Sequence, residues 1–143
     1  MVKFLIIGDL HGQKPIIHFK DFDAIIAPGD FCSDAPRQYM FQALKARLEN
    51  KKSKLKWQDI VGKKTAKIMV EKSLHDGRTI LEYLNSFNVP VYILPGNWDW
   101  TTNKEDNWSL TKKDFYHNYL IKGLDNLVDM QHKRSKFGDY ELI

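Results

Sequence analysis

The stretch VPVYILPG, residues 89–96, is an apolar run that ends at a Pro-Gly corner, and two other stretches share this form. VKFLIIG covers residues 2–8, and DAIIAPG covers residues 23–29. Each run has about the length of a buried strand, is apolar on both faces and ends at a glycine. Such continuous apolar runs are typical of a parallel or mixed sheet that is covered on both sides. The sequence therefore predicts an α/β fold.

The composition is that of a single globular domain. The chain has 143 residues, of which 43% are hydrophobic and 28% are charged, enough to form a substantial core. No apolar run approaches the roughly 20 residues that span a bilayer, so no membrane partner is expected. Cys32 is the only cysteine and excludes an intrachain disulfide, which favours a cytoplasmic location. The net charge of +4 permits a polyanionic partner without requiring one.

Between the second and third apolar runs the pattern becomes helical. The break NKKSK, residues 50–54, separates two helical segments, and Gly62 and Gly77 weaken the prediction of one unbroken second helix. We interpret the region as a crossover helix with an inserted helical hairpin, the insertion covering about residues 36–85. The apolar positions that recur at helical spacing are Met40, Phe41, Leu44, Leu48, Ala66, Met69, Val70, Leu74, Leu81 and Leu84.

After Trp100 the sequence predicts a polar loop, a short helix and two strands. The loop is TTNKEDNW, residues 101–108, and the helix is expected over residues 110–121. The strands are NLVDM and DYELI, joined by the polar turn QHKRSKFG. Because the chain ends within the second predicted strand, we expect the sequence to be the front part of a longer protein.

A constellation of polar side chains follows the three apolar runs. Asp9 and His11 are one residue apart, and in an extended segment their side chains point the same way. Asp30 and Asn97 follow the other two runs, and the carboxyl ends of neighbouring parallel strands meet at one edge of a sheet. Two carboxylates, an amide oxygen and an imidazole suit Mn²⁺, Fe or Zn²⁺. Taken singly, each residue could instead form a turn or a helix N-cap.

These motifs resemble those of the calcineurin-like metallophosphoesterase family. The family blocks read D-x-H, G-D and G-N-H-D or G-N-H-E, and the matching segments here are DLHG, PGDF and PGNWD. The resemblance covers residues 9–99 but not the helical insertion. It implies that residues 1–143 form one metallophosphoesterase domain, a β-sandwich of mixed sheets flanked by helices and incomplete at its C-terminus.

The resemblance also implies roles for single residues. Asp9 and His11 would bind a first metal, and Asp30 would bridge two. Asn97 would bind the second metal and act as the catalytic residue beside the substrate phosphate, with Trp98 and Asp99 on the substrate side. A metal-bound hydroxide would attack the phosphorus of a phosphoester, for example a phosphodiester. The implied metal is Mn²⁺, with Fe, Zn²⁺ or Ni²⁺ as alternatives; a complete member holds two ions, and this chain one or none.

Two departures from the family pattern bear on activity. Trp98 stands where the family has a histidine that protonates the leaving group, and an indole N–H serves only as a hydrogen-bond donor. Trp98 could otherwise form a hydrophobic lid over the loop. The family also has further histidines in G-H and G-H-x-H blocks, whereas only His117 and His132 follow Asn97 here. Neither fits those blocks, so we expect both to be ordinary packing or surface residues.

Two functions from different classes therefore stay open. One is a metal-dependent phosphoesterase, and the other is a non-catalytic binding or scaffold protein of the same fold.

A basic run adds a second question, because it could contact nucleic-acid phosphates or form a solvated helical surface. Trp98, Trp100 and Trp108 could stack on a flat group or pack a loop, and Cys32 is expected to pack as a small apolar side chain. The basic run consists of Lys51, Lys52, Lys54, Lys56, Lys63, Lys64 and Lys67.

Overall fold

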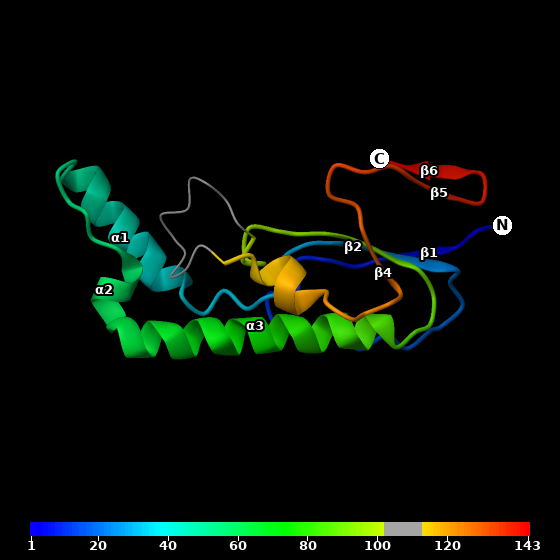
Figure 1. The fold of residues 1–143 in the computed structure, drawn as a ribbon, viewed down its shortest axis with the longest axis horizontal. Helices are drawn as coiled ribbons and strands as arrows, with labels where there is room; N and C mark the ends of the chain where they lie inside the picture. Colours follow the sequence, from blue (N-terminus) through cyan, green and yellow to red (C-terminus); the bar gives the residue numbers. More distant parts are fainter. Residues whose placement is uncertain (102–112) are drawn as a thin grey trace.

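The computed structural model describes residues 1–101 and 113–143, and its centre is a parallel sheet (Figure 1). The sheet follows the order of the chain and confirms the α/β class. Its register pairs Leu5 with Ile25, and Val91 with both Ile25 and Leu127. The four strands are β1 (Phe4–Ile6), β2 (Ala24–Pro28), β3 (Val91–Leu94) and β4 (Leu127–Asp129).

Three helices lie between β2 and β3. They are α1 (Arg37–Glu49), α2 (Trp57–Val61) and α3 (Lys63–Asn85). The break predicted over residues 50–54 is confirmed, because α1 ends immediately before it. Gly62 separates α2 from α3 with a φ of 82°, a conformation that glycine adopts without steric cost. The other glycine, Gly77, lies inside an unbroken α3.

Described residues from all three connections between the parallel strands pack on one face of the sheet. Because such connections are right-handed, a sheet in chain order places them on a single side. In Figure 1, α3 runs along this side. Ile17 and Phe22 from the first connection share one apolar cluster with Leu81 of α3 and Leu120 from the third. This face forms the main core of the molecule.

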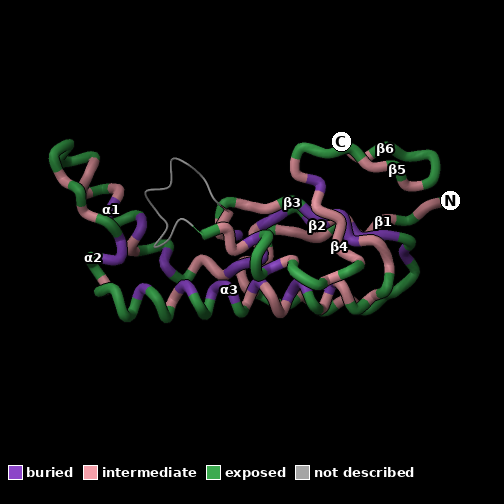
Figure 2. The backbone as a smooth tube through the Cα atoms, viewed as in Figure 1, coloured by how far each residue is buried: buried purple, intermediate pink, exposed green. Residues whose placement is uncertain are grey.

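The opposite face of the sheet is covered by a two-stranded antiparallel hairpin formed by β5 (Ser135–Phe137) and β6 (Tyr140–Leu142). Alternate strand residues point to opposite faces. Ile93 of β3 therefore faces the helices, and Tyr92 faces the hairpin. Figure 2 shows the resulting buried strip along the strands and α3. The sheet is thus covered on both sides, as the apolar runs predict.

Several details differ from the sequence expectations. The predicted turn over residues 131–138 contains β5, and β4 pairs in parallel with β3. The helix expected over residues 110–121 is a π-helical turn, η1 (Tyr116–Leu120), in the described part. Among the described residues the larger sheet is entirely parallel, and its partner has only two strands. Residues 102–112, including Trp108, lie outside the described residues.

No helix within residues 1–101 or 113–143 combines the length and the apolar character that a bilayer span requires.

Candidate metal centre

Three of the predicted metal ligands lie together at the carboxyl edge of the sheet. Asp9 and His11 follow β1, and Asp30 follows β2. One potential ligand atom from each side chain lies within 4.8 Å of the others. The Nε2 atom of His11 is 2.8 Å from Oδ1 of Asp9. The geometry expected from parallel strand ends is therefore present for these three residues.

Backbone hydrogen bonds continue beyond the two strand ends and fix the loops that carry these side chains. The N–H of Asp9 donates to the carbonyl of Gly29 at 3.1 Å. The N–H of His11 donates to the carbonyl of Asp30 at 2.8 Å, and that of Gly12 to Phe31 at 2.9 Å. The two loops therefore remain side by side after the regular pairing ends.

All three candidate ligands have left-handed backbone conformations. The φ angles are 57° for Asp9, 45° for His11 and 54° for Asp30. Asp and His enter this region more readily than most non-glycine residues, but each instance still costs on the order of 1 kcal/mol. Strained residues of this kind cluster at functional sites. Three of them within one cluster favour a role beyond simple turn formation.

The third strand end packs tightly against the second because both carry glycine. A Cβ atom added to Gly29 would lie 2.3 Å from the backbone nitrogen of Gly96. One added to Gly96 would lie 2.2 Å from Oδ1 of Asp30. The N–H of Trp98 donates to that same Oδ1 at 2.9 Å. The PGNWD turn thus abuts the Asp30 carboxylate.

Asp99 ties the second and third strand ends together from a fully buried position. Its Oδ1 accepts the N–H groups of Phe31 at 2.8 Å and Cys32 at 3.0 Å. Its Oδ2 accepts those of Asp30 and Gly96, both at 2.8 Å. Burial raises the pKa of Asp99, and the backbone donors oppose that rise. Asp99 therefore holds the loops in place and does not lie on the substrate side, where the sequence led us to expect it.

Asn97 occupies the tip of this turn, between two residues that contact Asp30. Its side chain is exposed, and no hydrogen bond connects its amide with another described residue. The turn therefore places Asn97 next in the chain to Trp98, whose N–H contacts the Asp30 carboxylate. Its assignment as a fourth ligand and as the catalytic residue stays a prediction.

The two described tryptophans of this loop pack in different ways. Trp98 is partly buried against the core, and its ring lies edge-on to His11 with centroids 6.4 Å apart. Trp100 donates its indole N–H to Oγ of Ser73 on α3 at 3.2 Å. Trp98 therefore borders the candidate site, whereas Trp100 fastens the loop to the helix.

Cys32 has the packing role that its size predicts. Its side chain is fully buried, and burial raises the pKa of its thiol well above the usual value. A Cβ added to Gly77 would lie 2.6 Å from its Sγ atom. Gly77 therefore permits α3 to approach the strand end, which is why this glycine lies within a helix.

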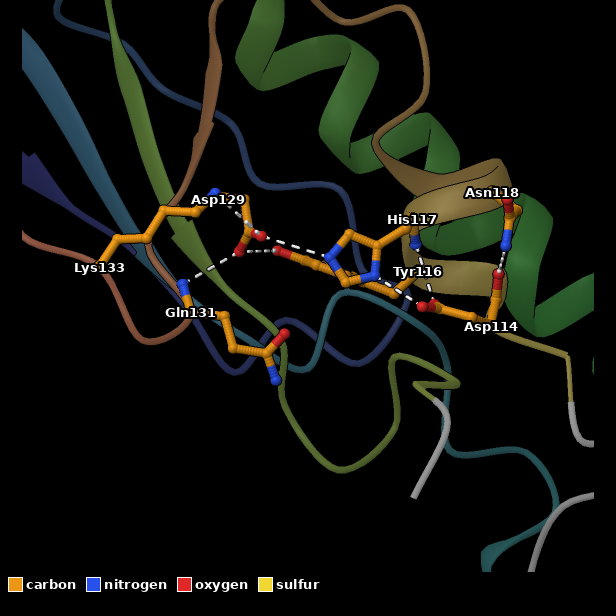
Figure 3. A network of polar contacts seen from close by, with 7 residues as sticks. All are labelled: Asp114, Tyr116, His117, Asn118, Asp129, Gln131 and Lys133. Carbon is orange, nitrogen blue, oxygen red and sulfur yellow. Dashed lines mark hydrogen bonds and ion pairs between the residues drawn. The ribbon is translucent and has the colours of Figure 1, made fainter. Parts of the chain in front are cut away.

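His117 forms an ionic network that the sequence analysis missed (Figure 3). Its Nδ1 lies 2.7 Å from Oδ2 of Asp114, and its Nε2 lies 3.3 Å from Oδ2 of Asp129 at the end of β4. Partial burial lowers the pKa of His117, but its hydrogen bonds to Asp114 and Asp129 outweigh that effect and raise it overall. His117 is thus a surface residue that ties η1 to β4. His132 is exposed in the turn after β4.

The donor set fits a divalent cation on two structural grounds. Within the described part of the chain, no lysine or arginine forms an ion pair with Asp9 or Asp30; Asp9 lies against the imidazole of His11, and Asp30 accepts the backbone N–H of Trp98. In addition, Nδ1 of His11 is buried and lacks a hydrogen-bond partner in the described ranges. A cation would offset the carboxylate charges, and mixed carboxylate and imidazole donors suit a divalent metal ion.

Comparison with known proteins adds no family assignment. Neither protein-family models, nor curated proteins, nor solved structures yield a match to this chain.

Proposed function

We propose that the protein is a metal-dependent phosphoesterase of the calcineurin-like type. The observation that carries this proposal is the convergence of Asp9, His11 and Asp30 within 4.8 Å at the carboxyl edge of a parallel sheet. This edge is where open α/β sheets bind their ligands. The DLHG, PGDF and PGNWD motifs lie in the three adjacent loops of that edge.

In this proposal Asp9, His11 and Asp30 hold one divalent cation, with Mn²⁺ the first candidate. The ion would supply Lewis-acid polarisation of the phosphoryl group and acidify a bound water. The protein itself holds the three metal-ligating side chains in place before the ion binds. Asp99 orders the loops after β2 and β3 through four backbone donors, and Gly96 permits the approach of the third loop.

The architecture around the edge is compatible with a metallophosphoesterase sandwich. The parallel sheet has helices on one face and the β5–β6 hairpin on the other. In the proposal the hairpin belongs to the second sheet of the sandwich, and the helices α1 and α2 belong to the insertion. The proposal thus assigns the motif-bearing loops to the family core and the helices to a separate feature.

A direct test is hydrolysis of bis-p-nitrophenyl phosphate with added Mn²⁺. Asp30→Asn keeps the size of the side chain and removes its charge. Mutation of a residue that only hydrogen-bonds a metal ligand typically lowers metal affinity or activity about 10–100-fold. Because Asp30 is itself a proposed ligand, we expect its loss to lower activity at least about 100-fold. Asp139→Asn is the matched control, because Asp139 is exposed in the turn of the β5–β6 hairpin. Equal rates for Asp30→Asn and wild type would rule out the proposed chemistry.

A non-catalytic binding protein of the same fold is the second candidate, and Trp98 is the observation that favours it. The indole lies edge-on to His11 and supplies no group that can protonate a leaving alcohol. The two candidates differ in one readout. Saturable Mn²⁺ binding without Mn²⁺-dependent hydrolysis of aryl phosphoesters, whose leaving groups need no acid, would favour the binding protein.

A further inference from the structure

A basic groove that shares no residue with the candidate metal centre lies between the start of α3, the preceding α2 and the segment before η1. Its volume is about 760 Å³, within the usual range for small-molecule sites. Five lysines of the described ranges line it: Lys54, Lys56, Lys63, Lys67 and Lys113. Four of the seven lysines of the basic run noted in the sequence therefore line a concave surface.

The groove has an excess of positive charge. Among the described residues that line it, Asp59 and Glu71 are acidic, and they do not balance Lys54, Lys56, Lys63 and Lys67. Both acids also have local partners, because Asp59 accepts the backbone N–H of Lys56 at 3.0 Å and Glu71 pairs with Lys67 at 3.6 Å. The ligand chemistry that this surface favours is anionic.

The N-terminus of α3 adds to this charge. The helix begins at Lys63 after Gly62, with no side-chain cap and no acidic residue in its first turn. The first N–H groups of a helix lack intrahelical partners, and the macrodipole is positive there. The positive end of the helix dipole repels the lysines there, whereas a bound phosphate would be stabilised by the lysines and by the helix N-terminus.

Gln58 provides an independent indication of a ligand. This residue lines the groove and is 8% exposed, and its Oε1 atom is buried without a hydrogen-bond partner in the described part of the chain. A buried unpaired amide oxygen is costly. An amide presents one acceptor and two donors, which match the edge of a nucleobase. Val70, Leu74 and Phe115 supply the apolar part of the lining.

We propose that this groove binds a nucleoside phosphate, either free or as a unit of a single-stranded nucleic acid. Its phosphate would lie among the lysines at the N-terminus of α3. Its base would pack on the apolar lining and Phe115, with its edge toward Gln58. Stacking on aromatic side chains and lysine–phosphate contacts are the two ordinary contributions to such binding.

The proposal is independent of the metal centre, although both sites use α3. Leu74 lines the groove, and the adjacent Ser73 donates its hydroxyl to the carbonyl of Ser33 in the loop after β2. The test is therefore made in EDTA, where the candidate metal centre contributes nothing. Failure of the phosphoesterase proposal would leave the outcome of this test unchanged.

The measurement is the fluorescence anisotropy of a fluorescein-labelled oligouridylate with the full chain, at salt concentrations from about 50 to 300 mM. We expect Lys56→Ala/Lys63→Ala to weaken binding about tenfold at the lowest salt. It should also reduce the slope of log affinity against log salt by about 1.4, because each phosphate contact on a single strand contributes about 0.7. Lys51→Ala/Lys52→Ala is the matched control: it removes the same charge from the same basic run outside the groove, and we expect less than a twofold change.

A second comparison tests recognition of the base. AMP should displace the probe more effectively than ribose 5-phosphate, and Gln58→Leu should reduce this difference while the packing of the base on Phe115 preserves part of it. Displacement by AMP at concentrations far below those of the oligonucleotide would indicate a free nucleotide, and the reverse order a nucleic-acid strand; both support the site. Absence of saturable binding, equal losses in the two lysine pairs, or equal displacement by polyglutamate would overturn the proposal.

Discussion

Replacing Asp99 by alanine should destabilise the fold and loosen the candidate metal centre together. The carboxylate is fully buried and accepts four backbone N–H groups from the loops after β2 and β3. In Asp99→Ala, the N–H groups of Phe31 and Cys32 would remain buried without an acceptor. Those of Asp30 and Gly96 are partly buried, so water would replace their acceptor more easily.

The magnitude follows from these four donors. A buried unpaired N–H costs about 1–3 kcal/mol, which gives about 2–6 kcal/mol for the two buried groups. The substitution also removes a buried carboxylate whose charged form is disfavoured by burial, as its raised pKa indicates, and this offsets part of the loss in stability. We therefore expect a net loss of about 3 kcal/mol in the free energy of unfolding. That is a large fraction of the roughly 5–15 kcal/mol typical of a domain.

Urea denaturation at neutral pH, followed by tryptophan fluorescence, measures this loss. With a slope of about 1.5 kcal/mol per M, the midpoint should fall by about 2 M. Asp99→Asn retains the size but only one accepting oxygen, so it separates lost hydrogen bonds from lost packing and should also destabilise the fold. Asp139→Ala, an exposed control, should stay within about 0.5 kcal/mol of wild type. A loss below about 1 kcal/mol in Asp99→Ala would refute the role assigned to this carboxylate.

Three further variants test other contacts. His117→Gln should lower the free energy of unfolding at about pH 6 but not at about pH 9. The pKa of His117 is raised above 6.5 in the folded state, so its protonation stabilises the fold fully below pH 6.5, and this stabilisation is lost as the pH rises through the folded-state pKa. A difference in urea titrations that does not depend on pH would contradict this. Gly96→Ala should reduce Mn²⁺ affinity at least tenfold in calorimetry, because the added Cβ would lie 2.2 Å from Oδ1 of Asp30; unchanged affinity would show that the loop accommodates it. Arg78→Met should lower the melting temperature by several degrees, since its Nη1 donates to three carbonyls at the end of η1, and an unchanged melting temperature would count against this role.

The sequence predicted those features that depend on simple periodicity. Continuous apolar runs identified β1, β2 and β3, and a glycine at each run's end located the loops that carry Asp9, His11 and Asp30. Parallel strands bring their carboxyl ends to one edge, so the meeting of these side chains followed from the class of sheet alone.

Features that depend on tertiary packing were not predicted. Asp99 was expected beside the substrate because it belongs to the same motif as Asn97, yet its flanking residues Trp98 and Trp100 were a signal of burial. β5 has only three residues within a polar segment, and Phe137 packs against Phe4 and Tyr92 on the far face of the sheet. Gly77 was expected to weaken a helix, but close packing against Cys32 requires it there.

Anomalous X-ray diffraction from crystals soaked in Mn²⁺ would test the proposed metal centre most directly. We expect a strong anomalous peak at coordination distance from Asp9, His11 and Asp30, and no such peak in crystals of Asp30→Asn. A wild-type crystal at saturating Mn²⁺ with no peak among these three side chains, or with the ion bound only elsewhere, would contradict this expectation.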